Sequence, residues 1–542
     1  MIRGGRVLSV FTREWLEGDV AIVDGVIAGL GDYEGVETID AAGRYLIPGF
    51  VDPHLHVESS KLLIDEFARL VLPLGTTAVV ADPHEIANVL GTDGVHWLLD
   101  EAAKLPLDVY FMASSCVPAS SFESPRRELS PGDLEGLLRR RHVLGLAEMM
   151  NFPGVVSGAG SELEKLALAQ HIDGHAPGVT GKALNAYAAA GIESDHEAAT
   201  LEEGRERLRA GLWLLIREAS SARNLHALAP LALEYGPARM AFCTDDREPE
   251  HVADDGHINA IVRDAVALGL PPEDAIVMAT LNPAAYHGLH HLGAIAPGRR
   301  ADILFLDDLV SFVPERVLKR GRPVVEIAPV TVPDWVRRSV HVGRLDAVHF
   351  RVPWRGGKAR VIGLVPDQII TASLVHELTA VDGFAVADPS RDLAKIAVFE
   401  RHLETGRVGL GFVHGFGLER GALGSTVAHD AHNLIVVGAD DASMLTAAER
   451  LRDLGGGLVV ADGDRVLAEL PLPVAGLLSD RPLAEVLAAS RALGAAVRLL
   501  GVTFPQPVQM LAFLSLSVIP ALKITDRGLV DVERFELVPL EI

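Results

Sequence analysis

Cysteine is nearly absent from the sequence, and long apolar runs are missing. The 542 residues include two cysteines, Cys116 and Cys243, which can form neither a secreted-type disulfide framework nor a cysteine-rich zinc site. The same count excludes the zinc base deaminases, which need a Pro-Cys-x-x-Cys motif. No uncharged run of about 18 apolar residues occurs, and no apolar segment precedes Arg13. We therefore expect no membrane span, no signal peptide and a cytoplasmic protein.

Positive charge is also scarce. Lysine and arginine number 49 against 73 acidic residues, which gives a net charge of −24. Because phosphate groups are bound by clustered Lys and Arg, we expect neither nucleic acid nor an anionic membrane as a partner. The 49% hydrophobic and 23% charged residues are typical of a globular protein and exclude extended disorder.

Strand and helix patterns alternate between residues 47 and 288. Helical patterns, such as Leu201–Arg209, separate short apolar segments that have the pattern of buried parallel strands. These segments are Phe50–Val51, Thr76–Ala81, Leu107–Ala113, Val143–Ala147, His171–Gly174, Gly191–Ser194, Leu212–Ile216 and Arg239–Cys243. Eight β/α units in about 240 residues predict an α/β fold with a (β/α)8 TIM-like barrel.

Short strand patterns flank the barrel. Asp19–Val23 and Val26–Ala28 are joined by the strong turn signal Asp24-Gly25, and Ala301–Leu306 follows a Pro-Gly turn. We predict that segments 1–46 and 289–339 together form one small β-sandwich domain. Residues 340–542 show mixed strands, helices and glycine-rich turns, and we expect them to form a separate C-terminal α/β domain.

Two histidines end the first predicted barrel strand, in the sequence Asp52-Pro53-His54-Leu55-His56. Residues i and i+2 of a strand point to the same side, so both imidazoles can face one point at the end where barrel active sites lie. Neutral imidazoles suit Zn, Mn or Fe ions. Taken alone, this pair is as consistent with a loop as with a metal site.

The same strand-end position carries further ligand types around the predicted barrel. Glu148, His175, His196 and Asp245 end the fourth, fifth, sixth and eighth strands. Six protein ligands exceed the three of a single catalytic zinc and suit two ions that share a bridging carboxylate, for which Glu148 is the candidate. Asp245 can then act as the general base, although Asp246 remains an alternative at that strand end.

Other residues on the same face have open roles. Asp82, His84 and Glu85 follow the second strand, where a substrate-binding or supporting role and a plain turn are equally consistent with the sequence. Ser115 ends the third strand beside Cys116, which we interpret as a packed thiol. His432, like its neighbour His429, either reaches the active site or caps a turn, and we slightly favour the turn.

Several sequence segments resemble those of the amidohydrolase superfamily and, within it, the adenine deaminases. They cover nearly the whole chain and are Pro48–Ser60, Ala81–Asn88, Gly145–Asn151, Asp173–Gly178, Ser194–Glu197, Cys243–Arg247, Ala428–Asn433 and Val518–Asp526. Hydantoinases and dihydroorotases carry a metal-bridging carbamylated lysine where this sequence has Glu148. That difference favours the adenine deaminase branch.

The resemblance implies a cytoplasmic enzyme of purine salvage that converts adenine and water to hypoxanthine and ammonia with a metal-activated hydroxide. It implies two divalent metal ions per subunit, Mn or Fe before Zn, and a homo-oligomer (a dimer or higher). The metal ligands it implies are His54, His56, Glu148, His175, His196 and Asp245. Another amidohydrolase activity, on a cyclic amide or an N-acetyl group, is the alternative. A non-catalytic scaffold is disfavoured because every expected ligand is present.

Overall fold

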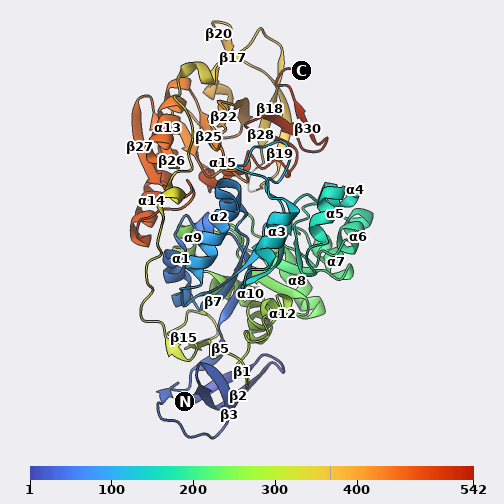
Figure 1. Ribbon diagram of the computed structural model, residues 1–542, viewed down its shortest axis with the longest axis vertical. Helices are drawn as coiled ribbons and strands as arrows, with labels where there is room; N and C mark the ends of the chain where they lie inside the picture. Colours follow the sequence, from blue (N-terminus) through green and yellow to red (C-terminus); the bar gives the residue numbers. More distant parts are fainter. Residues whose placement is uncertain (366–367) are drawn as a thin grey trace.

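The computed structural model describes residues 1–365 and 368–542, which form three stacked parts (Figure 1). A β-sheet lies at one end, a helix-covered barrel lies in the middle, and residues 340–542, here called the C-terminal part, lie at the other end. One apolar core runs without a break from the barrel into the C-terminal part, through residues such as Val57, Leu62 and Leu477. These two parts therefore share a buried interface.

The barrel consists of parallel strands that are buried on both faces. In the described residues there are eight: β6 (Phe50–Leu55), β7 (Thr76–Ala81), β8 (Asp108–Ala113), β9 (Val143–Met149), β10 (Ile172–Gly174), β11 (Ser194–Asp195), β12 (Trp213–Arg217) and β13 (Met240–Cys243). A parallel bridge between Leu55 and Asp245 joins the last strand to the first. Gly174 N donates to Ser194 Oγ over 3.2 Å between β10 and β11. The sheet thus curls into a ring, with the eight strands at the predicted places.

Helices follow the strands and cover the outside of the ring. They are α1 (Ile64–Val71), α2 (His84–Ala102), α3 (Pro131–Leu138), α4 (Phe152–Ser157), α5 (Gly160–Leu166), α6 (Gly181–Ala189), α7 (Leu201–Arg209), α8 (Leu225–Tyr235), α9 (Pro249–Asp255), α10 (Ile258–Ala267), α11 (Pro272–Ala279) and α12 (Leu281–Tyr286). Helix α7 has its predicted bounds because Thr200 and Glu203 form a capping box at its start. Helix α1 is preceded by Lys61, whose backbone has a left-handed conformation (φ 58°).

The terminal sheet combines strands from both sides of the barrel sequence. It contains β1 (Ile2–Ser9), β2 (Glu14–Val23), β3 (Val26–Leu30), β4 (Ile39–Asp40), β5 (Tyr45–Pro48), β14 (Ile303–Leu306), β15 (Arg316–Lys319) and β16 (Arg322–Pro323). Asp24 and Gly25 both have positive φ (51° and 78°), as the primed hairpin turn predicted there requires. The sequence predicts a β-sandwich. The described strands instead hydrogen-bond as one continuous sheet, with β14 antiparallel to β5.

The C-terminal part is built on a mostly antiparallel sheet in the order β19-β18-β23-β22-β25-β24-β26-β27. Its strands are β17 (Val352–Pro353), β18 (Lys358–Leu364), β19 (Thr371–Glu377), β20 (Ala380–Val381), β21 (Phe384–Ala385), β22 (Leu393–Phe399), β23 (Val408–His414), β24 (Ala422–Ser425), β25 (Leu434–Gly438), β26 (Gly457–Asp462), β27 (Arg465–Pro471), β28 (Leu522–Thr525), β29 (Gly528–Asp531) and β30 (Glu536–Val538). Its helices are α13 (Asp441–Leu454), α14 (Leu483–Leu499) and α15 (Pro507–Phe513).

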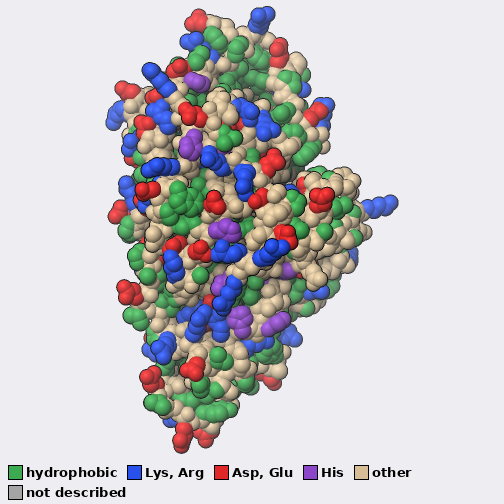
Figure 2. All heavy atoms as spheres, in the orientation of Figure 1, with side chains coloured by type: hydrophobic (Ala, Val, Ile, Leu, Met, Phe, Trp, Pro, Cys, Tyr) green, Lys and Arg blue, Asp and Glu red, His purple; other side chains and the backbone are tan. Residues whose placement is uncertain are grey.

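Charge is spread over the surface. Figure 2 shows acidic and basic side chains mixed on the visible face, so the acidic excess is not gathered in one patch there. Within 1–365 and 368–542, no helix has the length and apolarity to cross a bilayer.

Candidate metal centre and active site

His54 and His56 project from the end of β6 toward one point. Nε2 of His56 lies 3.3 Å from Asp245 Oδ1 and 3.3 Å from Glu148 Oε1, and Nε2 of His54 lies 3.9 Å from the same Asp245 oxygen. The Nδ1 atom of His56 is 3.1 Å from the carbonyl oxygen of Asp82, which orients the ring. Because Nδ1 is engaged with the backbone, Nε2 of His56 is the nitrogen that faces the centre.

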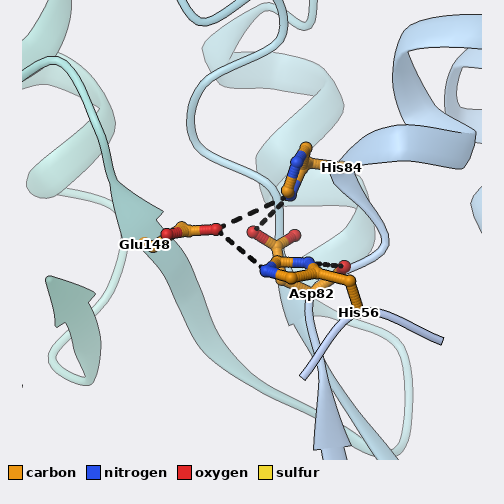
Figure 3. A group of neighbouring side chains, drawn as sticks. All are labelled: His56, Asp82, His84 and Glu148. Carbon is orange, nitrogen blue, oxygen red and sulfur yellow. Dashed lines mark hydrogen bonds and ion pairs between the residues drawn. The ribbon is translucent and has the colours of Figure 1, made fainter. Parts of the chain in front are cut away.

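Glu148, at the end of β9, lies between the histidines. Its Oε2 is 2.8 Å from His175 Nδ1 and 3.3 Å from His196 Nε2. Its Oε1 faces His56 and is 3.7 Å from His84 Nδ1 (Figure 3). Burial alone would raise the pKa of Glu148. Hydrogen bonding and charge from His175 and His196 outweigh burial and hold this pKa well below its ordinary value. A buried, ionised carboxylate thus lies between His56 on one side and His175 and His196 on the other.

Asp245 and Asp246 follow β13 but point in different directions. Asp245 has a left-handed backbone (φ 53°), its N–H donates to the His54 carbonyl over 3.1 Å, and its carboxylate faces the histidines. The Asp246 carboxylate instead accepts a hydrogen bond from Ser59. Of the two candidates, Asp245 is therefore the one whose carboxylate lies in the histidine cluster.

The spacing of these groups fits metal coordination. Two ligand atoms that each lie about 2.1 Å from one ion are about 3.0 to 3.4 Å apart at octahedral to tetrahedral angles. The measured 3.3 Å separations around Glu148 and Asp245 match that range. In the described part of the chain, Nε2 of His54 is buried and has no hydrogen-bond partner. Buried carboxylates and imidazoles, one of them with an unpartnered nitrogen, form the kind of donor set that a divalent cation stabilises.

The remaining predicted residues support this cluster. Asp82 Oδ2 lies 3.2 Å from His84 Nδ1, and its Oδ1 accepts from Ser114 over 2.6 Å. Ser115 Oγ donates to the carbonyl oxygens of Ala147 and Glu148, so this side chain holds the end of β9 rather than facing the cavity. Glu85 is fully buried beside Ser59, whose Oγ donates to it over 3.3 Å.

Most of the histidines and carboxylates of this cluster line a cavity, and two further residues that the sequence did not predict also line it. Arg217 ends β12 and pairs with both Glu197 and Asp245, whose Oδ2 accepts from Nη1 over 2.8 Å. Glu197 Oε1 lies 3.5 Å from both His175 and His196. The strand-end rule could have found Arg217, because it ends the seventh strand. Glu197 directly follows the predicted ligand His196.

The C-terminal part also contributes to the site. Asp430 Oδ1 lies 3.4 Å from His84 Nε2, and His429 lines the same cavity, so the preference for a plain turn at His429 is wrong. His432 Nδ1 accepts from the N–H of Ala428 within its own turn, and its Nε2 lies 3.4 Å from Glu85 Oε2. His432 thus caps a turn and also contacts the barrel.

A buried ring of histidines and carboxylates at the carboxyl ends of a parallel barrel is the kind of site that metal-dependent hydrolases use. A family model described as the amidohydrolase family matches residues 45–324, and one described as the adenine deaminase C-terminal domain matches residues 368–536.

Whole-chain relatives agree with the two family models. The chain is 47% identical to "Adenine deaminase 2" of Carboxydothermus hydrogenoformans, with 100% of this chain and 97% of the relative covered. It is 47% identical to the adenine deaminase of Oleidesulfovibrio alaskensis (100% and 96% covered) and 45% identical to that of Archaeoglobus fulgidus (100% and 95% covered). The chain belongs to the adenine deaminase family of the amidohydrolases.

Proposed function

We propose that this protein is an adenine aminohydrolase. Water adds its oxygen to C6 of adenine, the bond from C6 to the exocyclic nitrogen breaks, and hypoxanthine and ammonia are the products. The observation that carries the proposal is the placement of Glu148 among His56, His175 and His196, in a chain whose full-length relatives are adenine deaminases. We place the reaction in purine salvage, in a cytoplasmic homo-oligomer with domains at 47–288, at 340–542 and at 1–46 with 289–339.

The residues of the ring fit a pair of divalent metal ions. His54, His56 and Asp245 would hold one ion, His175 and His196 would hold the other, and Glu148 would serve both. The pairwise spacings and the unpartnered His54 nitrogen support this assignment. Bound divalent ions would lower the pKa of a water molecule and stabilise negative charge on the reacting oxygen. We propose Mn or Fe as the working metal.

Asp245 is the proposed proton carrier. Its Oδ1 faces the histidines, while its Oδ2 is held by Arg217. Burial alone would raise the pKa of Asp245. The hydrogen bond to His56 and the charge of Arg217 outweigh burial and hold this pKa well below its ordinary value. The ionised carboxylate accepts a proton from the attacking water and delivers it to the departing nitrogen.

Arg217 orients this proton carrier. Its guanidinium donates to Glu197 through both Nη atoms and to Asp245 through Nη1. One planar guanidinium group therefore holds both carboxylates. All three side chains are buried. Arg217 therefore keeps Oδ1 of Asp245 turned toward the cavity without itself entering the reaction.

Ammonia release tests the proposed function. Purified protein is assayed with adenine, adenosine and a hydantoin, and the metal content of the same sample is measured. We expect ammonia from adenine, with about two divalent ions per chain, and no ring opening of the hydantoin. Ring opening without ammonia release would favour the alternative amidohydrolase activity on cyclic amides.

A further inference from the structure

The cavity above the ring is lined by residues from both the barrel and the C-terminal part. The barrel contributes Met150 and five of the six proposed metal ligands, all except His54, and the C-terminal part contributes Ile369, His429, Asp430, Phe513 and Leu516. These two groups come from segments far apart in the chain, and they meet at the carboxyl ends of the strands. The C-terminal part therefore forms the wall that faces the reacting centre.

The wall has an apolar side. Phe513, the last residue of α15, is buried and lines the cavity with Ile369 and Leu516. The ring of Phe513 is stacked on that of His429, with a centroid separation of 4.9 Å and an interplanar angle of 18°. A flat apolar surface of this kind suits the face of an aromatic heterocycle, because every base presents a π-face on which it can stack.

The wall also has an unsatisfied acceptor. The side chain of Asp430 is buried, with Oδ1 within 3.5 Å of His84 Nε2 and His429 Nδ1. Across the described residues, its other oxygen, Oδ2, has no hydrogen-bond partner. A buried carboxylate oxygen without a donor is costly, so a ligand N–H in this cavity would be favoured.

We propose that the C-terminal part is the purine-recognition wall of the enzyme. Phe513, with Ile369 and Leu516, contacts the face of the base, and Asp430 Oδ2 accepts a hydrogen bond from the N–H of its imidazole ring. This inference rests on adenine as the substrate and deepens that proposal. The free base carries that N–H, whereas a nucleoside carries ribose at N9, so Asp430 selects the base over the nucleoside.

The wall is tested with Phe513→Ala and a matched control, Phe416→Ala. Phe416 is a fully buried phenylalanine of the same part that packs against Phe504 and does not line the cavity. Loss of one stacking partner should raise KM for adenine about tenfold in Phe513→Ala and leave kcat within about threefold. Phe416→Ala should lose stability and keep the wild-type KM.

Asp430 is tested with Asp430→Leu and Asp430→Asn. Removal of the acceptor in Asp430→Leu should raise KM for adenine at least tenfold and reduce the preference for adenine over adenosine in kcat/KM by a similar factor. Asparagine keeps one acceptor oxygen, so Asp430→Asn should recover part of the affinity for adenine and part of the preference for adenine over adenosine. An unchanged preference for adenine in Asp430→Leu would contradict the assignment.

Equilibrium binding separates this inference from the proposed function. Calorimetric titration with hypoxanthine measures recognition without turnover. A Kd about tenfold weaker in Phe513→Ala, beside a wild-type Kd in Phe416→Ala, supports the wall, and equal values in the two variants overturn it. If the metal-loaded wild-type protein released no ammonia from adenine, the proposed function would fall instead, whatever the binding result.

Discussion

Arg217 Nη1 donates a hydrogen bond to Asp245 Oδ2 over 2.8 Å, in a part of the protein where both side chains are buried. Burial alone would lower the pKa of a guanidinium. The carboxylates of Glu197 and Asp245 outweigh burial and raise the pKa of Arg217 above its ordinary value. This residue is therefore a permanent cation that balances part of the negative charge around the ring.

Replacement of Arg217 should reduce turnover more than substrate binding. Arg217→Met leaves Asp245 free to turn, and a misplaced proton carrier costs about 100-fold in kcat. Arg217→Lys keeps the charge but cannot serve both carboxylates with a planar fork, so its loss should be intermediate. Steady-state kinetics on adenine measure both variants. A wild-type kcat in Arg217→Met would show that Asp245 needs no partner.

Substitution at the two adjacent aspartates distinguishes their roles. Asp245→Asn should lower kcat by about 10² to 10⁴-fold, because an amide cannot accept the proton of the attacking water. Asp246→Asn should have a smaller effect, because the Asp246 carboxylate lines the same cavity but accepts a hydrogen bond from Ser59, whereas Asp245 faces His56. Kinetics and metal analysis of both purified variants check this. If the metal-replete Asp245→Asn protein retained its turnover, Asp245 would not be the general base.

Metal removal should cost stability as well as activity. Without a metal ion, the buried carboxylates of Glu148 and Asp245 both lie 3.3 Å from His56, and Arg217 balances only part of their negative charge. Chelation should abolish ammonia release and lower Tm, and Mn²⁺ or Fe²⁺ should restore both at about two ions per chain. Free metal at 1,000 times its Kd stabilises the fold by about 4 kcal/mol.

Glu148→Gln supplies the control for this experiment. The variant keeps the shape of the side chain but loses its charge, so chelation should shift its Tm less than that of the wild type. An equal shift in the two proteins would show that the lost metal is not bound near Glu148.

Lys523 gives folding a pH dependence that is independent of the metal centre. Its Nζ donates to the carbonyl oxygens of Ile369 and Phe513, and burial lowers its pKa from 10.5 to about 7. Between about pH 7 and pH 10.5 the folded chain therefore binds fewer protons than the unfolded chain. This group makes the free energy of unfolding rise with pH in that window, by at most about 1.4 kcal/mol per pH unit.

Urea unfolding at pH 6 to 10 measures this contribution. Relative to Lys523→Met, the wild type should have its lowest free energy of unfolding below pH 7. This relative stability should increase as the pH rises toward 10. Lys182→Met, at an exposed lysine, should run parallel to the wild type. A pH-independent difference for Lys523→Met would show that the buried amine does not titrate in this window.

The barrel could be predicted because its signals are local. Each buried strand is a short apolar segment, and the residue that follows it lies at the common edge of the sheet. His175 and His196 could be placed together by that rule alone, without any distance information. The turn at Asp24-Gly25 was readable for the same reason, since its chemistry lies within two residues.

The C-terminal contribution could not be predicted because it depends on long-range packing. Nothing in the local sequence of Asp430 indicates that it faces His84, which belongs to a helix near the start of the chain. The strand order of the terminal sheet could not be predicted, because strand patterns report burial and do not report which strand pairs with which. Arg217 satisfies the strand-end rule, but its role as an orienting cation depends on its contacts with Glu197 and Asp245, which lie elsewhere in the sequence.

The order of residues along the chain also sets an order in time. The last proposed metal ligand, Asp245, leaves the ribosome well before Phe513 completes the wall. At 5–20 residues per second, the roughly 270 residues between them take on the order of 10 to 50 s to synthesise. During this interval the proposed ligands of the barrel exist without the C-terminal residues that line the same cavity in the folded protein.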